Sequence, residues 1–186
     1  MSDAPRPAEL AGLVAGPDDD LPPPDPERLV GQLAVLLARL HDLDVPEGSA
    51  PGLVPVDLVD AARRAVDGGW RPAPSGPYAH MSALRLVEVL AAGTATAGGT
   101  RCLTHGSPTV DRLRVRDGSP VLTDWEAAAI ADPYRDLAVA ALDVARSIGP
   151  MLVPVLFERY REARPSAGVP DPRRLDWYVL AGQFRS

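Results

Sequence analysis

Residues 105–113 read HGSPTVDRL, residues 123–126 read TDWE, and residues 131–138 read ADPYRDLA. Between the first two segments, Leu113, Val115 and Val121 flank Asp117-Gly118, a dipeptide that favours a two-residue hairpin turn. The region therefore predicts a polar loop, a β-hairpin, a second polar segment and the start of a helix, in that order.

Helical periodicity extends on both sides of this region. The first helix is expected to begin at Asp25-Pro26, because Asp is a favoured N-cap and Pro suits the first helical position. Arg101–Thr104 is a candidate short strand. Helices are expected over residues 26–43, 56–66, 81–90, 137–148, 151–163 and 171–184. We therefore expect an α+β, mostly α-helical fold with three helices, a hairpin and three further helices.

The composition narrows the class of protein and partner. The 186 residues carry a net charge of −6, which argues against nucleic acid as a partner because phosphate backbones require a basic surface. All 19 basic residues are arginine, and the sequence contains neither lysine nor asparagine. The single cysteine, Cys102, excludes a disulfide framework and is expected to be buried and unreactive. With no signal-peptide pattern and no apolar run of membrane-spanning length, we expect a cytoplasmic protein with no membrane partner.

The three segments resemble the catalytic core of the aminoglycoside phosphotransferase family. That family shows H-G-D-x-x-x-x-N in its catalytic loop, then a hairpin, then an I-D-W segment with a metal-binding Asp, and then D-x-x-x-D-L-A at a helix start. The matching residues here are His105, Gly106, Asp124, Asp132, Asp136, Leu137 and Ala138. Outside the core, residues 33–45 look like the family's L-x-x-L-H helix end, and residues 157–160 and 171–184 look like its closing helices.

The resemblance implies a protein-kinase-like fold with ATP and Mg²⁺ as the family's cofactors and a small molecule as ligand. It implies that residues 25–186 form the C-terminal lobe. Residues 1–24, which are rich in proline and contain an acidic run, are then an irregular arm or hinge remnant, too short for the family's N-terminal lobe. That lobe carries a Lys for the nucleotide phosphates. The small-residue segment 94–100 has no Lys and does not resemble a phosphate loop.

Two positions of the catalytic loop depart from the family. Ser107 stands where the family has its catalytic Asp, and a hydroxyl cannot act as a general base near neutral pH. Arg112 aligns with the metal-binding Asn, and a guanidinium repels a cation instead of ligating it. Asp124 is then the one candidate metal ligand left. Near the C-terminus, Gly182 and Gln183 stand where the family places acids that attract cationic aminoglycosides.

The other residues of the pattern are expected to have structural roles. His105 is expected to orient the catalytic loop, and Asp136 to accept hydrogen bonds from loop amides. Asp124 either binds a metal or is held by backbone amides at the hairpin exit. Asp111 is a second carboxylate near the lost Asn position, but its side chain is expected to point differently. His41 is expected to pack at the end of its helix.

These observations predict a degenerate, catalytically inactive, pseudokinase-like module that binds a ligand or a partner at the old cleft. The alternative is an ATP-dependent phosphotransferase, acting on a small-molecule hydroxyl, whose N-terminal lobe comes from a separate chain. A third interpretation is a protein that forms homo-oligomers or binds a protein partner through the apolar surface that an N-terminal lobe would cover. A folded remnant without a selected role is the fourth.

Overall fold

The structure, a computed structural model, describes residues 25–45, 52–99 and 101–184. The arm predicted for residues 1–24 lies outside the described residues.

One group of helices surrounds a core beside the β-hairpin. It consists of α2 (Pro26–His41), α5 (Tyr134–Ser147) and α6 (Val153–Ala163). Asp25 caps α2 by accepting a hydrogen bond from the backbone N–H of Arg28 at 3.3 Å. The apolar side chains buried here come from all three helices and from the hairpin, and include Val30, Leu33, Leu37, Leu113, Leu122, Leu137, Val144 and Leu156.

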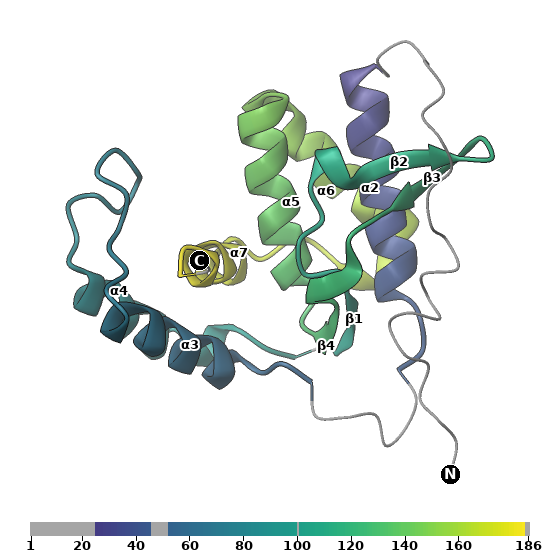
Figure 1. The fold of residues 1–186 in the computed structure, drawn as a ribbon. Helices are drawn as coiled ribbons and strands as arrows, with labels where there is room; N and C mark the ends of the chain where they lie inside the picture. Colours follow the sequence, from purple (N-terminus) through teal and green to yellow (C-terminus); the bar gives the residue numbers. More distant parts are fainter. Residues whose placement is uncertain (1–24, 46–51, 100, 185–186) are drawn as a thin grey trace.

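A second group of helices builds a separate core. It consists of α3 (Pro55–Asp67), α4 (Ala83–Ala92) and α7 (Pro172–Gly182). Its buried residues include Val59, Leu86, Leu90, Trp177, Tyr178, Leu180 and Phe184. Figure 1 shows α3 and α4 on one side of the molecule, α2 and α6 on the other, and α5 and α7 between them. None of the helices in the described segments has the length and apolar character that crossing a membrane requires.

Two small antiparallel sheets lie beside α2. In the first, β2 (Leu113–Arg116) pairs with β3 (Ser119–Leu122), so that Leu113 faces Leu122. Their turn residues Asp117 and Gly118 have φ values of 50° and 74°, as a type I′ hairpin turn requires. In the second sheet, β1 (Cys102–Thr104) pairs with β4 (Ala129–Ala131). The polar loop of residues 105–112 connects β1 of one sheet to β2 of the other.

The predicted order of three helices, a hairpin and three helices is confirmed, and so is the mostly helical α+β class. Strand β4 was not predicted, because three residues rich in alanine carry little strand preference. Helix α5 begins at Tyr134 instead of Leu137, since the Asp132 carboxylate accepts the Tyr134 N–H at 2.9 Å and extends the helix start. Residues 150–152 form a 3₁₀ turn before α6 begins.

Candidate functional site

Asp136 holds the first turn of the polar loop through two backbone amides. Its carboxylate oxygens accept the N–H of His105 at 2.7 Å and the N–H of Gly106 at 2.6 Å, and all three residues are buried. Gly106 has a φ of 88°, and a Cβ atom at this position would collide with the carbonyl oxygen of Ala127. Glycine is therefore required for the loop to approach the carboxylate in this conformation.

His105 ties the loop to the exit of the hairpin. Its Nε2 donates to the Thr123 carbonyl oxygen at 2.7 Å, and its Nδ1 accepts the Ser107 N–H at 3.3 Å. These two partners assign the hydrogen to Nε2. Burial, the largest cause, lowers the pKa of His105 from its ordinary value of 6.5. The buried ring, 4.7 Å from the ring of Trp125, is arranged to brace the loop.

Ser107 lines a hollow of about 620 Å³, which we call the loop hollow. The backbone carbonyl of Ser107 accepts a hydrogen bond from Arg112 Nη1 at 2.9 Å. Asp143 on α5 closes the floor of the hollow, where its carboxylate accepts the Val110 N–H at 2.7 Å and the Ser147 hydroxyl at 3.1 Å. Other residues that line the hollow are Leu29, Thr109 and Asp111.

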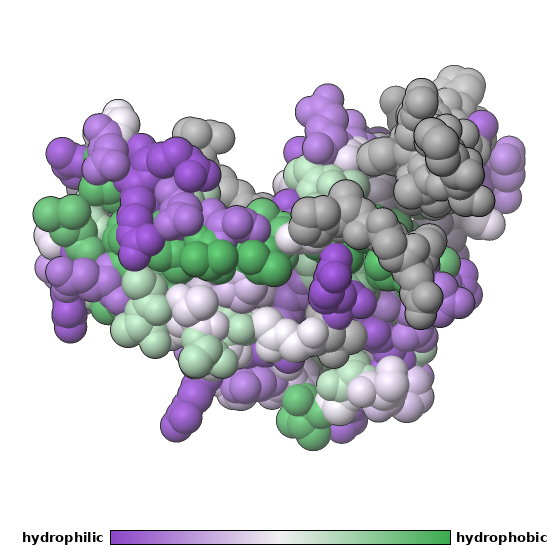
Figure 2. All heavy atoms as spheres, turned by 90° about the horizontal axis from the view of Figure 1, so that it is seen from below, coloured by the Kyte–Doolittle hydropathy of each residue, from purple (hydrophilic) through white to green (hydrophobic). Residues whose placement is uncertain are grey.

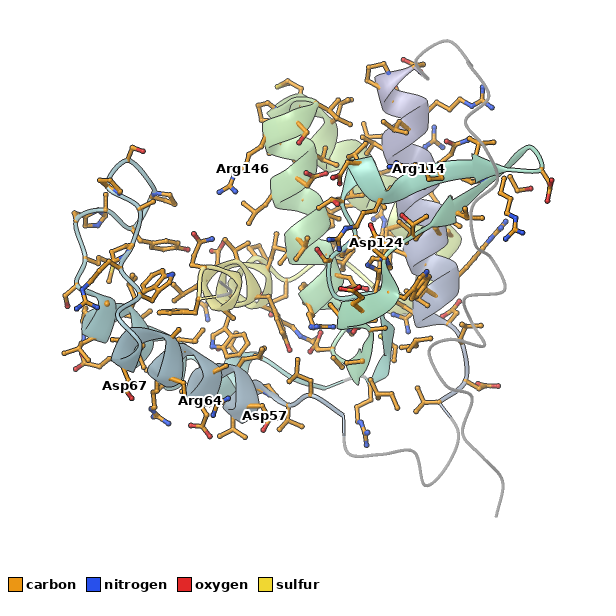
Figure 3. All side chains as sticks on the ribbon, viewed as in Figure 1. Asp57, Arg64, Asp67, Arg114, Asp124 and Arg146 are labelled. Atoms are coloured by element: carbon orange, nitrogen blue, oxygen red, sulfur yellow. The ribbon has the colours of Figure 1, made fainter. Side chains whose placement is uncertain are left out.

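Arg112 and Asp124 form an ion pair across the site. Arg112 Nε lies 3.6 Å from Asp124 Oδ2, and the two side chains are 30% and 65% exposed. Asp124 itself has a left-handed backbone, with a φ of 61°, at the point where the hairpin exits. Figure 3 shows Asp124 in the centre of the molecule, whereas Arg146 projects from the opposite side of α5. The Arg112 guanidinium thus provides a positive charge beside the Asp124 carboxylate.

Arg135 and Asp132 brace the site from the start of α5. Arg135 donates to the Thr104 hydroxyl at 2.9 Å and to the Ala127 carbonyl at 2.9 Å, which links β1 to the segment before β4. Asp132 forms an ion pair with Arg174 of α7 and accepts the Gly98 N–H at 3.1 Å. These contacts fix the position of the helix that carries Asp136.

The profile of the phosphotransferase enzyme family matches residues 3–178, which is most of the chain. The chain belongs to this family. The resemblance inferred from residues 105–138 is thereby confirmed.

Solved structures with the same fold include several antibiotic phosphotransferases. An aminoglycoside-3′-phosphotransferase of type VIII superposes with a TM-score of 0.71 at 22% identity, covering 86% of this chain and 61% of that one. The aminoglycoside phosphotransferase APH(3″)-Id from Streptomyces rimosus gives 0.69 at 19% identity, with coverages of 86% and 62%. A macrolide 2′-phosphotransferase type I gives 0.60 at 19% identity, with coverages of 91% and 56%. No curated protein sequence matches significantly.

The chain spans about 60% of the length of the first two of these structures. At identities of 22% and below, the similarity establishes a shared fold. It therefore remains a prediction that residues 25–186 form a C-terminal lobe without an N-terminal lobe.

The structure of this family member brings the predicted site residues together. His105, Ser107 and Asp136 meet at the loop, and Asp124 reaches it from the hairpin exit. Asp111, whose side chain was expected to point differently, lines the same hollow as Ser107, and its exposed carboxylate accepts the hydroxyl hydrogen of Thr109. Cys102 is buried on β1, and burial raises the pKa of its thiol to about 12.

Asp124 is the one carboxylate of this site that was predicted to hold a metal. Within the described residues, no three His, Cys, Asp or Glu side chains come together as a metal site. Asp124 stands beside a guanidinium, which competes with a divalent cation for the same oxygen. We therefore assign no metal to this site.

Sequence reasoning missed three side chains of the site. Asp143 accepts the Val110 N–H from 33 positions away, His41 of α2 contacts Asp136, and Tyr160 of α6 contacts His41. Periodicity placed His41 and Tyr160 on helices, but the partner of a buried polar side chain is not encoded by spacing. A polar residue on an otherwise apolar helix face was the signal that could have drawn attention to them.

Proposed function

We propose that this chain is a phosphotransferase-family protein that binds a ligand or partner at the former transfer site and does not transfer phosphate. The observation that carries this proposal is the Arg112–Asp124 ion pair beside Ser107. Phosphoryl transfer in this family requires a carboxylate to orient and accept the proton of the acceptor hydroxyl, and Ser107 supplies a second hydroxyl in its place.

The charge at the site also opposes a magnesium nucleotide complex. Transfer needs a cation that bridges the phosphates, held by protein oxygens. The Arg112 guanidinium already pairs with the Asp124 carboxylate. A divalent ion would have to displace this guanidinium from the carboxylate and would then lie close to its positive charge. The Arg112 guanidinium therefore competes with a divalent ion for the Asp124 carboxylate.

Ligand binding is supported by the loop hollow. Its volume of about 620 Å³ lies in the range of small-molecule sites. It combines the apolar side chains of Leu29 and Ile148 with the hydroxyls of Ser107 and Thr109. A small molecule with hydroxyl groups suits this lining.

A transfer assay tests the proposal. The purified chain is incubated with radiolabelled ATP, Mg²⁺ and a panel of aminoglycosides and macrolides, next to an Asp124→Ala variant. We expect no difference between the two proteins and no transfer above the background without protein. Transfer that depends on Asp124 would overturn the proposal.

The second candidate is a phosphotransferase completed by another chain. It is supported by the intact loop framework and by the greater length of the matched structures. Positioning and charge stabilisation supply much of phosphoryl transfer, so a hydroxyl at position 107 is not by itself decisive. If this candidate holds, the double substitution Ser107→Asp and Arg112→Asn, assayed with the partner, raises activity; no gain removes the candidate.

An apolar groove next to the site gives such a partner a place to dock. It is lined by Leu36, Leu40, Leu43, Leu103, Val121 and Trp125, and has a volume of about 190 Å³. Several large apolar side chains elsewhere are also exposed, among them Leu84, Val89 and Met151. Figure 2 shows apolar residues gathered in a band on the face seen from below. A homo-oligomer or protein partner follows as a proposal, which light scattering tests; a monomer at all concentrations would remove the homo-oligomer.

A further inference from the structure

A row of polar side chains runs through the apolar core behind Asp136. His41 Nε2 lies 3.1 Å from Asp136 Oδ2, and His41 Nδ1 lies 2.8 Å from the Tyr160 hydroxyl. The same hydroxyl lies 3.1 Å from Arg164 Nη1, and Arg164 Nε lies 2.7 Å from the exposed Asp42 carboxylate. His41 and Tyr160 are each 2% exposed. We call these five side chains the buried row.

For a neutral imidazole at His41, the hydrogens of the buried row have one consistent arrangement. Asp136 already accepts two backbone N–H groups, and as a carboxylate it can only accept, so His41 Nε2 must donate to it. A guanidinium can only donate, so the Tyr160 oxygen accepts from Arg164. The Tyr160 hydroxyl hydrogen then points to His41 Nδ1, and every bond runs in one direction from Arg164 to Asp136.

The Tyr160 hydroxyl is well suited to its position between Arg164 and His41. Burial, the largest cause, raises the pKa of Tyr160 to about 12, and the hydrogen bond from Arg164 opposes this rise. The hydroxyl therefore keeps its hydrogen throughout the physiological range and donates it to His41. With Nδ1 occupied as an acceptor, the imidazole cannot place its single hydrogen there and withdraw it from Asp136.

We propose that His41 and Tyr160 are positioning residues of the candidate site. The Tyr160 hydroxyl fixes the tautomer of His41, the His41 N–H fixes the orientation of the Asp136 carboxylate, and the carboxylate fixes the amides of His105 and Gly106. The loop that presents Ser107 is thus controlled from α6, on the side of Asp136 away from the loop. This role does not rest on the proposed loss of transfer, because it concerns the conformation of the loop alone.

Simple core packing would not require this arrangement. A buried polar network is no more stabilising than well-packed apolar side chains of similar volume. Its distinctive effect is to fix the orientation of the side chains that form it. The phenyl ring of Tyr160 fills the core equally well without its hydroxyl. Removing the hydroxyl therefore separates positioning from packing.

Nuclear magnetic resonance on ¹⁵N-labelled protein tests the proposal. In the wild type, long-range ¹H–¹⁵N spectra are expected to show His41 with its hydrogen on Nε2 and an acceptor nitrogen at Nδ1. In Tyr160→Phe, Nδ1 loses its donor, and we expect the His41 signals to move away from this pattern. The amide hydrogens of His105 and Gly106 should exchange about tenfold faster, as expected for one weakened hydrogen bond in the buried network.

Two comparisons make the result specific. Tyr78→Phe also removes a phenol hydroxyl, but from a half-buried side chain that packs against the second helical core, and it should leave His41 and both loop amides unchanged. His41→Gln keeps an N–H that can reach Asp136 and should retain the protection of the loop amides, whereas His41→Leu should lose it. This pair decides the matter if Tyr160→Phe does not fold.

Three results would overturn the proposal. They are a wild-type His41 with its hydrogen on Nδ1, loop amides that respond equally to Tyr160→Phe and Tyr78→Phe, and equal protection in His41→Gln and His41→Leu. None of these measurements uses a nucleotide or a substrate. Detection of phosphate transfer would refute the proposed function and leave this inference standing.

Discussion

At the scale of the residue, the loop owes its shape to Asp136 and to glycine at position 106. The carboxylate accepts two adjacent amides, which forces the backbone to turn sharply, and Gly106 permits the turn at a φ of 88°. The same framework would support a catalytic base at position 107, where this chain has Ser107. The backbone conformation of the loop therefore does not depend on which side chain stands at position 107, because Asp136 holds the loop through backbone amides.

The Gly106→Ala substitution should destabilise the fold far more than Gly118→Ala. Both residues have a positive φ, but a Cβ at Gly118 meets nothing within 4 Å, while at Gly106 it meets backbone. We expect Gly118→Ala to cost about 1 kcal/mol, the penalty of the left-handed conformation alone. Gly106→Ala should cost about 3 kcal/mol or more through the added collision. Urea unfolding measures both, and similar values would contradict the loop geometry.

The buried His105 should make the fold less stable in mild acid. Burial lowers its pKa in the folded chain from 6.5, so the unfolded chain binds its proton first as the pH falls. This destabilising effect of His105 is therefore absent above pH 6.5, and the free energy of unfolding decreases as the pH falls below 6.5. We expect the free energy of unfolding to fall less between pH 7.5 and 5 in His105→Gln than in the wild type.

Substitution of the exposed His80 is the control for this pH dependence. The His80→Gln variant should show the wild-type change with pH. Equal pH dependence in wild type and His105→Gln would mean that His105 is not held in its neutral form by the fold.

At the scale of the element, three helices begin with the same Asp-Pro dipeptide. Asp25, Asp132 and Asp171 each accept a backbone N–H at the start of α2, α5 and α7, at 3.3, 2.9 and 2.9 Å. The first and last starts were predicted from sequence, since both Asp-Pro dipeptides precede strong apolar periodicity. The predicted start of α5 at Leu137 is late, because the Asp132–Tyr134 hydrogen bond that extends the helix leaves no trace in the apolar periodicity.

The three caps should differ in their contribution to stability. Asp25→Ala and Asp171→Ala each remove a cap on an exposed helix end, which costs about 1 kcal/mol. Asp132→Ala also leaves Arg174 and the Gly98 N–H without their buried partner, so we expect a cost of about 3 kcal/mol. Chemical denaturation of the three variants provides the values. Equal values would show that the Asp132–Arg174 pair contributes nothing.

The elements were more predictable from sequence than the site. Helices of ten or more residues and the Asp117-Gly118 hairpin have local signals, so their order could be predicted. Strand β4 is defined only by its antiparallel pairing with β1, in which Leu103 lies opposite Ile130. Likewise, the contact of His41 with Asp136 joins residues 95 positions apart. Contacts of this kind depend on the packed helices, which a single sequence does not display.

At the scale of the whole molecule, the site lies where the first helical core meets the two small sheets. The hairpin contributes Asp124, α5 contributes Asp136 and Asp143, and the loop between β1 and β2 contributes Ser107 and Arg112. The family fold thus brings Ser107, Arg112, Asp124 and Asp136 to one site. We propose that Arg112 takes the place of a metal beside Asp124.

Calorimetric titration of the protein with ATP in the presence of Mg²⁺ tests this claim most directly. Wild type, Arg112→Asn and Asp124→Ala are compared, each with and without Mg²⁺. We expect no Mg²⁺-dependent binding by the wild type, and any Mg²⁺-dependent gain should appear in Arg112→Asn. Mg²⁺-dependent binding of ATP by the wild type that disappears in Asp124→Ala would contradict it.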